Sequence, residues 1–211
     1  MHSSNRKQHR VNVNNSFAPD TVVAEISSAW RQRDEREPSQ ASQKDDEPIG
    51  EACPFWLPSR QRCTEVLSTG LNCLAEALPP PPVNVSLRFA TSAESRELNQ
   101  SFRGKANPTN VLSFPTANLE DETWPPVSCG ESETSAEAAL LGDLVFCPEI
   151  VAAEAAQQGK NIADHWTHLL LHGLFHLLGY DHLTEEDASE MEALEIRALE
   201  SLGITNPYLL D

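Results

Sequence analysis

The chain has 211 residues and a mass of 23.3 kDa, which suits one domain of ordinary size with additional segments. Asp and Glu number 32 against 15 Lys and Arg, and the formal charge of −17 argues against a broad basic surface that holds nucleic acid by charge alone. The five cysteines form no C-x-x-C pair, no apolar run is long enough to cross a bilayer, and the first residues lack the apolar stretch of a signal peptide. The sequence therefore predicts a soluble, cytoplasmic protein and excludes membrane, secreted-disulfide and collagen-like classes.

Two polar stretches accompany the expected domain. Residues 1–52 are predicted to be a polar, partly disordered N-terminal extension, because residues 31–48 contain a single apolar side chain and cannot offset their ordering entropy. Residues 116–139 carry six acids and no base, which predicts a long surface loop. Residues 53–211 are expected to form a single domain that includes this loop.

Strand and helix patterns alternate along the rest of the chain. Apolar and polar side chains alternate over residues 83–90, which is typical of a half-buried strand, and Thr91 with Glu94 resembles a capping box. In chain order we expect a strand at 11–13 or 22–26, a helix at 57–78, a strand at 83–90, a helix at 91–102, strands at 110–115 and 140–146, and helices at 148–158, 164–178 and 184–202. The predicted class is α/β (α+β), with a small mixed β-sheet packed with helices.

Five of the seven histidines fall between residues 165 and 182, in and just after an expected helix that is apolar nearly all round. His172 and His176 are one turn apart on one face of that helix, Gly179 ends it, and His182 follows the break. Buried histidines need partners, and two imidazoles at this spacing can converge on one metal ion. The pattern favours a zinc site of three ligands over a hydrogen-bonded core cluster or a closed structural metal.

The spacing of these three histidines is that of the metzincin zinc proteases, with one difference. Those enzymes place a glutamate, their general base, directly after the first histidine, and Gly173 occupies that position here. Three ligands leave a fourth position open to water or substrate, as in catalytic zinc sites. His165, His168 and Asp181 are interpreted as helix packing or as groups that orient the ligands.

Four segments together resemble the YbeY family of bacterial rRNA-maturation endoribonucleases. They are HGLFHLLGYDH at 172–182, FRGKANPTNVLSFP at 102–115, LLGDLVFCPEIV at 140–151 and EMEALEIRAL at 190–199. The resemblance covers roughly residues 83–211. It implies an α/β fold around one zinc ion, with His172, His176 and His182 as ligands and Arg103 as a functionally important arginine.

The resemblance further implies a zinc-dependent, single-strand-specific endoribonuclease. Such an enzyme acts in maturation of the 16S rRNA 3′ end and in ribosome quality control. Family members are linked to the small ribosomal subunit, to one of its proteins and to the GTPase Era. Residues 53–211 are then the endoribonuclease domain, and the polar extension and the acidic loop depart from the family pattern.

The residues leave some alternatives open. Arg103 offers a guanidinium suited to phosphate oxygens, but a surface or strand-end arginine without a role in binding is the alternative. Asn110 and Ser113 are candidates to line the cleft, and Asp143 is a lone carboxylate. Two rival functions remain: a zinc hydrolase of another substrate such as a peptide, against which the missing glutamate argues, and a zinc-stabilised ribosome-assembly factor that acts by binding.

Overall fold

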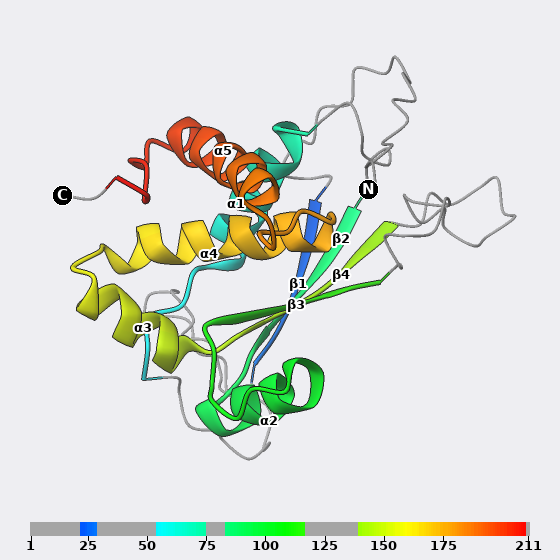
Figure 1. Ribbon diagram of the computed structural model, residues 1–211, viewed down its shortest axis with the longest axis vertical. Coiled ribbons are helices and arrows are strands. Elements are labelled where there is room, and N and C mark those ends of the chain that lie inside the picture. Colours follow the sequence, from blue (N-terminus) through cyan, green and yellow to red (C-terminus); the bar gives the residue numbers. More distant parts are fainter. Residues whose placement is uncertain (1–21, 29–53, 75–82, 117–138, 210–211) are drawn as a thin grey trace, which may run out of the picture.

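A computed structural model of the chain describes residues 22–28, 54–74, 83–116 and 139–209 (Figure 1). The described residues contain four strands and five helices. In chain order these are β1 (Val22–Ser28), α1 (Arg60–Asn72), β2 (Val83–Phe89), α2 (Ser92–Arg103), β3 (Val111–Pro115), β4 (Ala139–Phe146), α3 (Pro148–Gln157), α4 (Ile162–Leu177) and α5 (Glu185–Ser201). None of these helices is long and apolar enough to cross a membrane.

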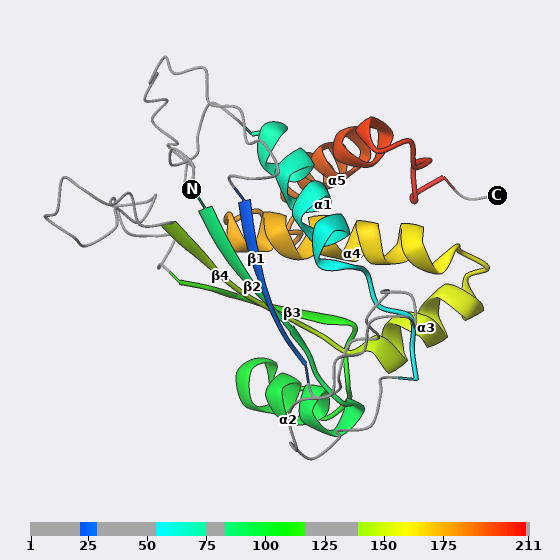
Figure 2. The same ribbon diagram turned by 180° about the vertical axis from the view of Figure 1, so that it is seen from behind.

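The four strands form one mixed sheet in the order β1-β2-β4-β3 (Figure 2). Strands β1, β2 and β4 are parallel, and β3 pairs antiparallel with β4 at the edge. The predicted small mixed sheet of an α+β fold is confirmed. Of the two candidate first strands, the one at residues 22–26 lies in β1, whereas residues 11–13 lie outside the described residues. Residues 117–138 of the acidic loop and most of the N-terminal extension also lie outside the described residues.

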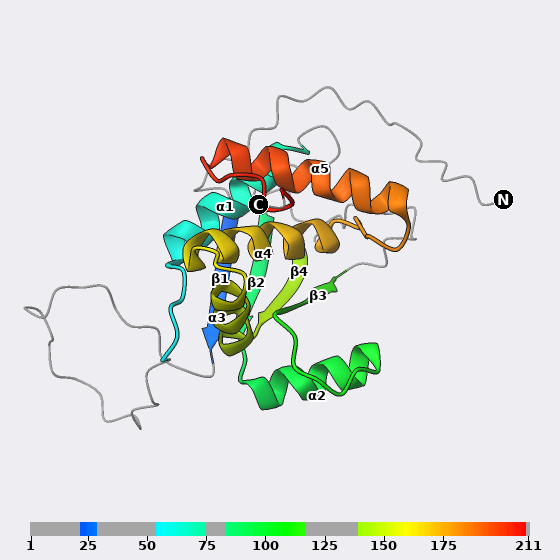
Figure 3. The ribbon, with the colours of Figure 1, turned by 60° about the vertical axis from the view of Figure 1, so that its left-hand side comes forward.

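The two faces of the sheet carry different layers. Helices α1 and α4 cover one face, α5 packs on the outside of these two helices, and α2 lies on the other face of the sheet (Figures 1 and 3). The larger core lies under α4, where the ring of Trp166 packs edge-on against Phe89 at 5.6 Å and tilted against Phe146 at 5.2 Å between centroids. On the other face, Leu98 of α2 packs on a smaller cluster that includes Leu112. Strand alternation thus divides the apolar side chains between two layers.

Local signals set the helix ends. Thr91, as predicted, and Thr184 cap α2 and α5 by accepting hydrogen bonds from backbone N–H groups in the first turn. The start predicted for α4 at Asp164 is wrong, because the Asn161 side chain caps the helix by accepting from two backbone amides, so that α4 begins at Ile162. Its predicted end is confirmed: Gly179 takes a φ of +87° directly after the last turn.

Candidate metal centre

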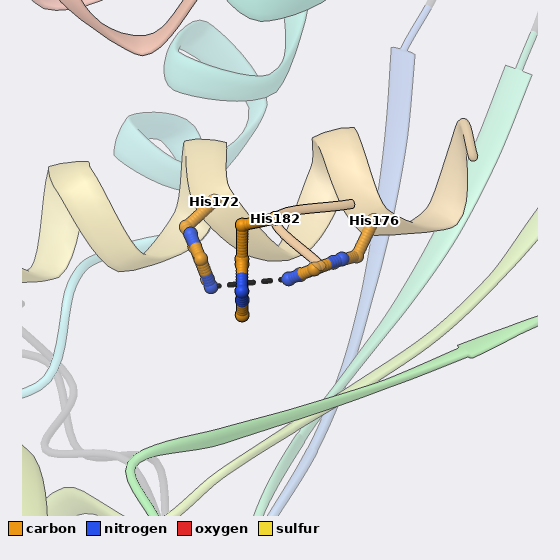
Figure 4. A group of neighbouring side chains, drawn as sticks. All are labelled: His172, His176 and His182. Carbon is orange, nitrogen blue, oxygen red and sulfur yellow. Dashed lines mark hydrogen bonds between the residues drawn. The ribbon is translucent and has the colours of Figure 1, made fainter. Parts of the chain in front are cut away.

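Three histidine side chains converge at the C-terminal end of α4. His172 and His176 leave the same side of the helix, and His182 reaches them from the segment that follows it (Figure 4). The Nε2 atoms of His172 and His176 are 3.2 Å apart, and one ring nitrogen of each of the three residues lies within 4.8 Å of the others. The spacing that predicted a common site therefore corresponds to a real cluster, and these residues are able to hold a metal ion.

The hydrogen bonds of the two helical histidines fix where their ring protons lie. Nδ1 of His172 lies 2.9 Å from a carboxylate oxygen of Glu195, and Nδ1 of His176 lies 2.9 Å from the backbone oxygen of Tyr180. An ionised carboxylate and a carbonyl oxygen accept hydrogen bonds only, so each Nδ1 carries the proton. The Nε2 atoms of the two rings then face each other, an arrangement that a shared cation stabilises.

The ring of His176 is neutral at physiological pH. Burial, followed by repulsion from His172 and His182, lowers its pKa to about 4, against the effects of Asp181 and of the Tyr180 carbonyl. Neutral imidazole is the form that binds metals. The donor set thus fits zinc, which takes three or four nitrogen or sulfur ligands in protein sites.

The third histidine depends on the turn after α4. The positive φ of Gly179 reverses the chain, and the carboxylate of Asp181 accepts a hydrogen bond from the backbone N–H of His182 at 2.8 Å. The His182 ring lies 5.6 Å from that of His172 and 5.1 Å from that of His176. His182 is exposed whereas the helical pair is half-buried, so the cluster opens towards solvent on the His182 side.

A buried glutamate that the sequence analysis missed orients this cluster. Glu195 of α5 is fully buried and accepts hydrogen bonds from His172, from Nε2 of His168 at 2.8 Å and from the Tyr208 hydroxyl. Burial raises the pKa of Glu195, but the hydrogen bonds from His168 and His172 outweigh it and bring the pKa to about 2. The sequence feature that could have identified Glu195 is its position on the apolar face of α5. It is next to Leu194 and one turn before Ala198 and Leu199.

The other residues singled out by sequence are placed as follows. Arg103 is the last residue of α2, is exposed, and makes no hydrogen bond or ion pair with a described residue, so no direct contact joins it to the histidines. Ser113 donates from Oγ to the backbone oxygen of Gly173 at 3.3 Å, and Asp143 is exposed on β4. Asn110 and His165 both contact Glu154 of α3.

Residues 58–203 match the sequence pattern of the family described as Endoribonuclease YbeY. The chain belongs to the YbeY family. An Endoribonuclease YbeY from Paramagnetospirillum magneticum is 45% identical over 160 residues, which cover 74% of this chain and 91% of the relative. The solution structure of TM1509 from Thermotoga maritima matches with 21% identity and a TM-score of 0.37, over 69% of this chain and 85% of that one.

The histidine cluster of this YbeY chain offers three nitrogen ligands to a metal ion. Within the described residues, no fourth His, Cys, Asp or Glu joins the three that converge. Structural zinc sites close all four positions with protein ligands, whereas catalytic sites keep one for water or substrate.

Proposed function

We propose that the protein is a zinc-dependent endoribonuclease that cuts single-stranded RNA. The observation that carries the proposal is the convergence of His172, His176 and His182, with the Nε2 lone pairs of the first two directed at each other. Membership of a family described as endoribonucleases supports RNA as the substrate. Zinc is the proposed ion because three neutral imidazoles with an open fourth position are a common catalytic zinc donor set.

The residues of the chain have separate parts in this reaction. A zinc ion held by the three histidines would act as a Lewis acid and would activate a water molecule as a nucleophile at neutral pH. Glu195 holds the ring of His172 through its Nδ1–H, and the Tyr180 carbonyl does the same for His176. Both contacts keep Nε2 available and prevent the rings from turning.

Arg103 is proposed to bind a phosphate of the RNA. Its side chain is exposed and unpaired among the described residues, so its five N–H donors are available. Phe102 beside it is 66% exposed and packs edge-on against Phe114 at 5.0 Å, which offers an aromatic surface next to the charge. An aromatic ring beside an arginine is a common way to hold single-stranded RNA.

The biological substrate is proposed to be the 16S rRNA precursor, at its 3′ end, with a further role in ribosome quality control. This proposal comes from the family and from the unusual charge. A chain of formal charge −17 binds naked RNA poorly, so the small ribosomal subunit, one of its basic proteins and the GTPase Era are proposed partners. Ribosome assembly would place the protein in the cytoplasm. Residues 53–211 are the proposed catalytic domain, with residues 1–52 and the loop 116–139 as additions to it.

The test is cleavage of an end-labelled single-stranded RNA by the full chain. Wild type, chelator-treated wild type, His176→Ala and Arg103→Ala are compared, with Arg60→Ala as a matched exposed-arginine control. Metal content is measured for each preparation, and circular dichroism verifies the fold. We expect cutting by wild type and by the control only, with restoration of the chelated enzyme by zinc.

Three results would contradict parts of this proposal. Equal cutting by wild type, chelated wild type and His176→Ala indicates a contaminating nuclease and favours an assembly factor that acts by binding. Full activity of Arg103→Ala shows that the reaction does not need the proposed contact between Arg103 and a phosphate. If cleavage depends on the histidines but is restored by another metal and not by zinc, the proposal that the ion is zinc is wrong.

A further inference from the structure

A cavity of about 300 Å³ adjoins the histidine cluster. His172 lines this cavity and also belongs to the cluster, so the two sites share one side chain. Its other lining residues come from four separate parts of the fold, among them Asn110, Glu154, Lys160, His165 and Tyr208. Its volume is at the lower end of the range for small-molecule pockets, which suits one nucleoside.

Glu154 presents a hydrogen-bond acceptor to this cavity. Its Oε2 accepts from Nδ2 of Asn110 at 3.0 Å and from Nε2 of His165 at 3.3 Å, and His165 is only 5% exposed. Its Oε1 receives no hydrogen bond from a described residue, and the side chain remains 30% exposed. One oxygen is therefore fixed by two donors while the other is free to accept from a ligand.

The lining favours a base over a phosphate. Glu154 is ionised at neutral pH, since hydrogen bonds from His165 and Asn110 outweigh the effect of burial and lower its pKa. A phosphate in this cavity would meet that negative charge, with only Lys160 to oppose it among the lysines and arginines that line the space. Tyr208 and Leu169 add an aromatic ring and an apolar side chain, against which a base can stack.

We propose that the cavity binds an amino-bearing base of the RNA strand, with Oε1 of Glu154 accepting a hydrogen bond from the exocyclic amino group. This inference rests on the proposed function for its substrate. Adenine, cytosine and guanine carry such a group. Uracil offers one N–H flanked by two carbonyl oxygens, which bring partial negative charge against the carboxylate. The enzyme is thus expected to prefer a strand that contains an amino-bearing base over one made of uridine alone.

Glu154→Gln tests the acceptor without a change of size. The amide oxygen of the glutamine is required at the Oε2 position to accept from Asn110 and His165. The amide nitrogen then faces the cavity as a donor, which suits a uracil carbonyl. The base preference should disappear or reverse in this variant. Glu200→Gln is the matched control, because Glu200 is an exposed glutamate of α5 that does not line the cavity.

Binding is measured with metal-free full-length protein, so that the RNA stays intact. Fluorescently labelled UUAUU, UUCUU and UUUUU strands are titrated at an ionic strength of about 0.15 M, which screens the repulsion between the acidic chain and the RNA, and circular dichroism verifies each variant. We expect wild type and Glu200→Gln to bind the strands with adenosine or cytidine about tenfold more tightly than the uridine strand, from one hydrogen bond to a charged group. Glu154→Gln should bind them no more tightly than the uridine strand.

The same strands, incubated with the zinc-loaded protein, separate this inference from the proposed function. Equal binding of all three strands by wild type, or an unchanged preference in Glu154→Gln, overturns the base site even if the RNA is cut. A preference that Glu154→Gln abolishes supports the base site even where no strand is cut, and in that case the endoribonuclease proposal fails.

Discussion

Replacement of Glu195 by glutamine should weaken metal binding by shifting a proton on His172. The two carboxylate oxygens have different partners: Oε1 accepts from His172, and Oε2 accepts from His168 and Tyr208. An amide has one oxygen, which best occupies the position with two donors. The amide nitrogen then points at Nδ1 of His172. Both groups carry N–H donors, so they repel each other and no hydrogen bond forms.

The clash is relieved when the proton of His172 moves from Nδ1 to Nε2. That proton occupies the lone pair directed at His176, whose Nε2 is 3.2 Å away. Loss of the group that orients a metal-binding histidine typically lowers metal affinity about 10- to 100-fold, or ~1.4–2.7 kcal/mol. In the opposite orientation the amide oxygen accepts from His172, and the amide nitrogen faces the donors of His168 and Tyr208. One buried donor then lacks an acceptor, which costs about 1–3 kcal/mol of folding free energy.

The assay is competition for zinc between the protein and a chromophoric chelator, with urea unfolding of the same metal-free preparations. Glu200→Gln, an exposed glutamate on the same helix, is the control and should bind zinc as wild type does. The reasoning is refuted if Glu195→Gln keeps the wild-type zinc affinity and the wild-type free energy of unfolding. A change of stability alone would limit Glu195 to a role in folding.

Three further predictions concern stability and reactivity. Gly142→Ala should lower the free energy of unfolding in urea by about 2–4 kcal/mol, because Gly142 has a φ of +147° and a Cβ there would lie 2.3 Å from the backbone oxygen of Phe114. Burial raises the pKa of Cys63 to about 12, so the folded chain should protect this thiol from alkylation at pH 8, as mass spectrometry of the labelled peptides will show. The unfolded thiol ionises near its ordinary pKa, so this group's contribution to stability is complete below about pH 9 and is lost as the pH rises towards 12. Asn99→Ala removes a buried amide that donates to the Asn107 carbonyl at 2.8 Å and should cost about 1–3 kcal/mol in thermal or urea unfolding.

The histidine cluster was predictable because its determinants are local. His172 and His176 share a helix face through the period of the helix, and Gly179 allows the reversal that brings His182 back. The same holds for β2, whose residues at alternate positions are buried as the pattern indicates. Helix and strand signals act over a few residues, so they are readable one segment at a time.

The features that could not be predicted involve contacts between distant segments. The contact of Glu195 with His172 joins α5 to α4, and its hydrogen bond with Tyr208 adds the C-terminal segment. Strand order is another such feature: β4 lies between β2 and β3, although β3 precedes it in the chain. An acidic residue on the apolar side of a helix signals a buried partner without identifying which residue that partner is.

The packing of α4 also explains why the first histidine is followed by glycine. A Cβ on Gly173 would lie 2.9 Å from Cδ2 and 3.2 Å from Cδ1 of Leu144, a fully buried side chain of β4. Ser113 of β3 donates to the Gly173 carbonyl on the same side of the helix, at 3.3 Å. A larger residue at this position therefore requires the Leu144 side chain, or α4 itself, to shift. Because Leu144 is fully buried between the helix and the sheet, such a shift disturbs the packing beneath the helix that carries two of the three histidines. The close approach of helix and sheet at Gly173 thus disfavours a glutamate, the protease general base, at this position.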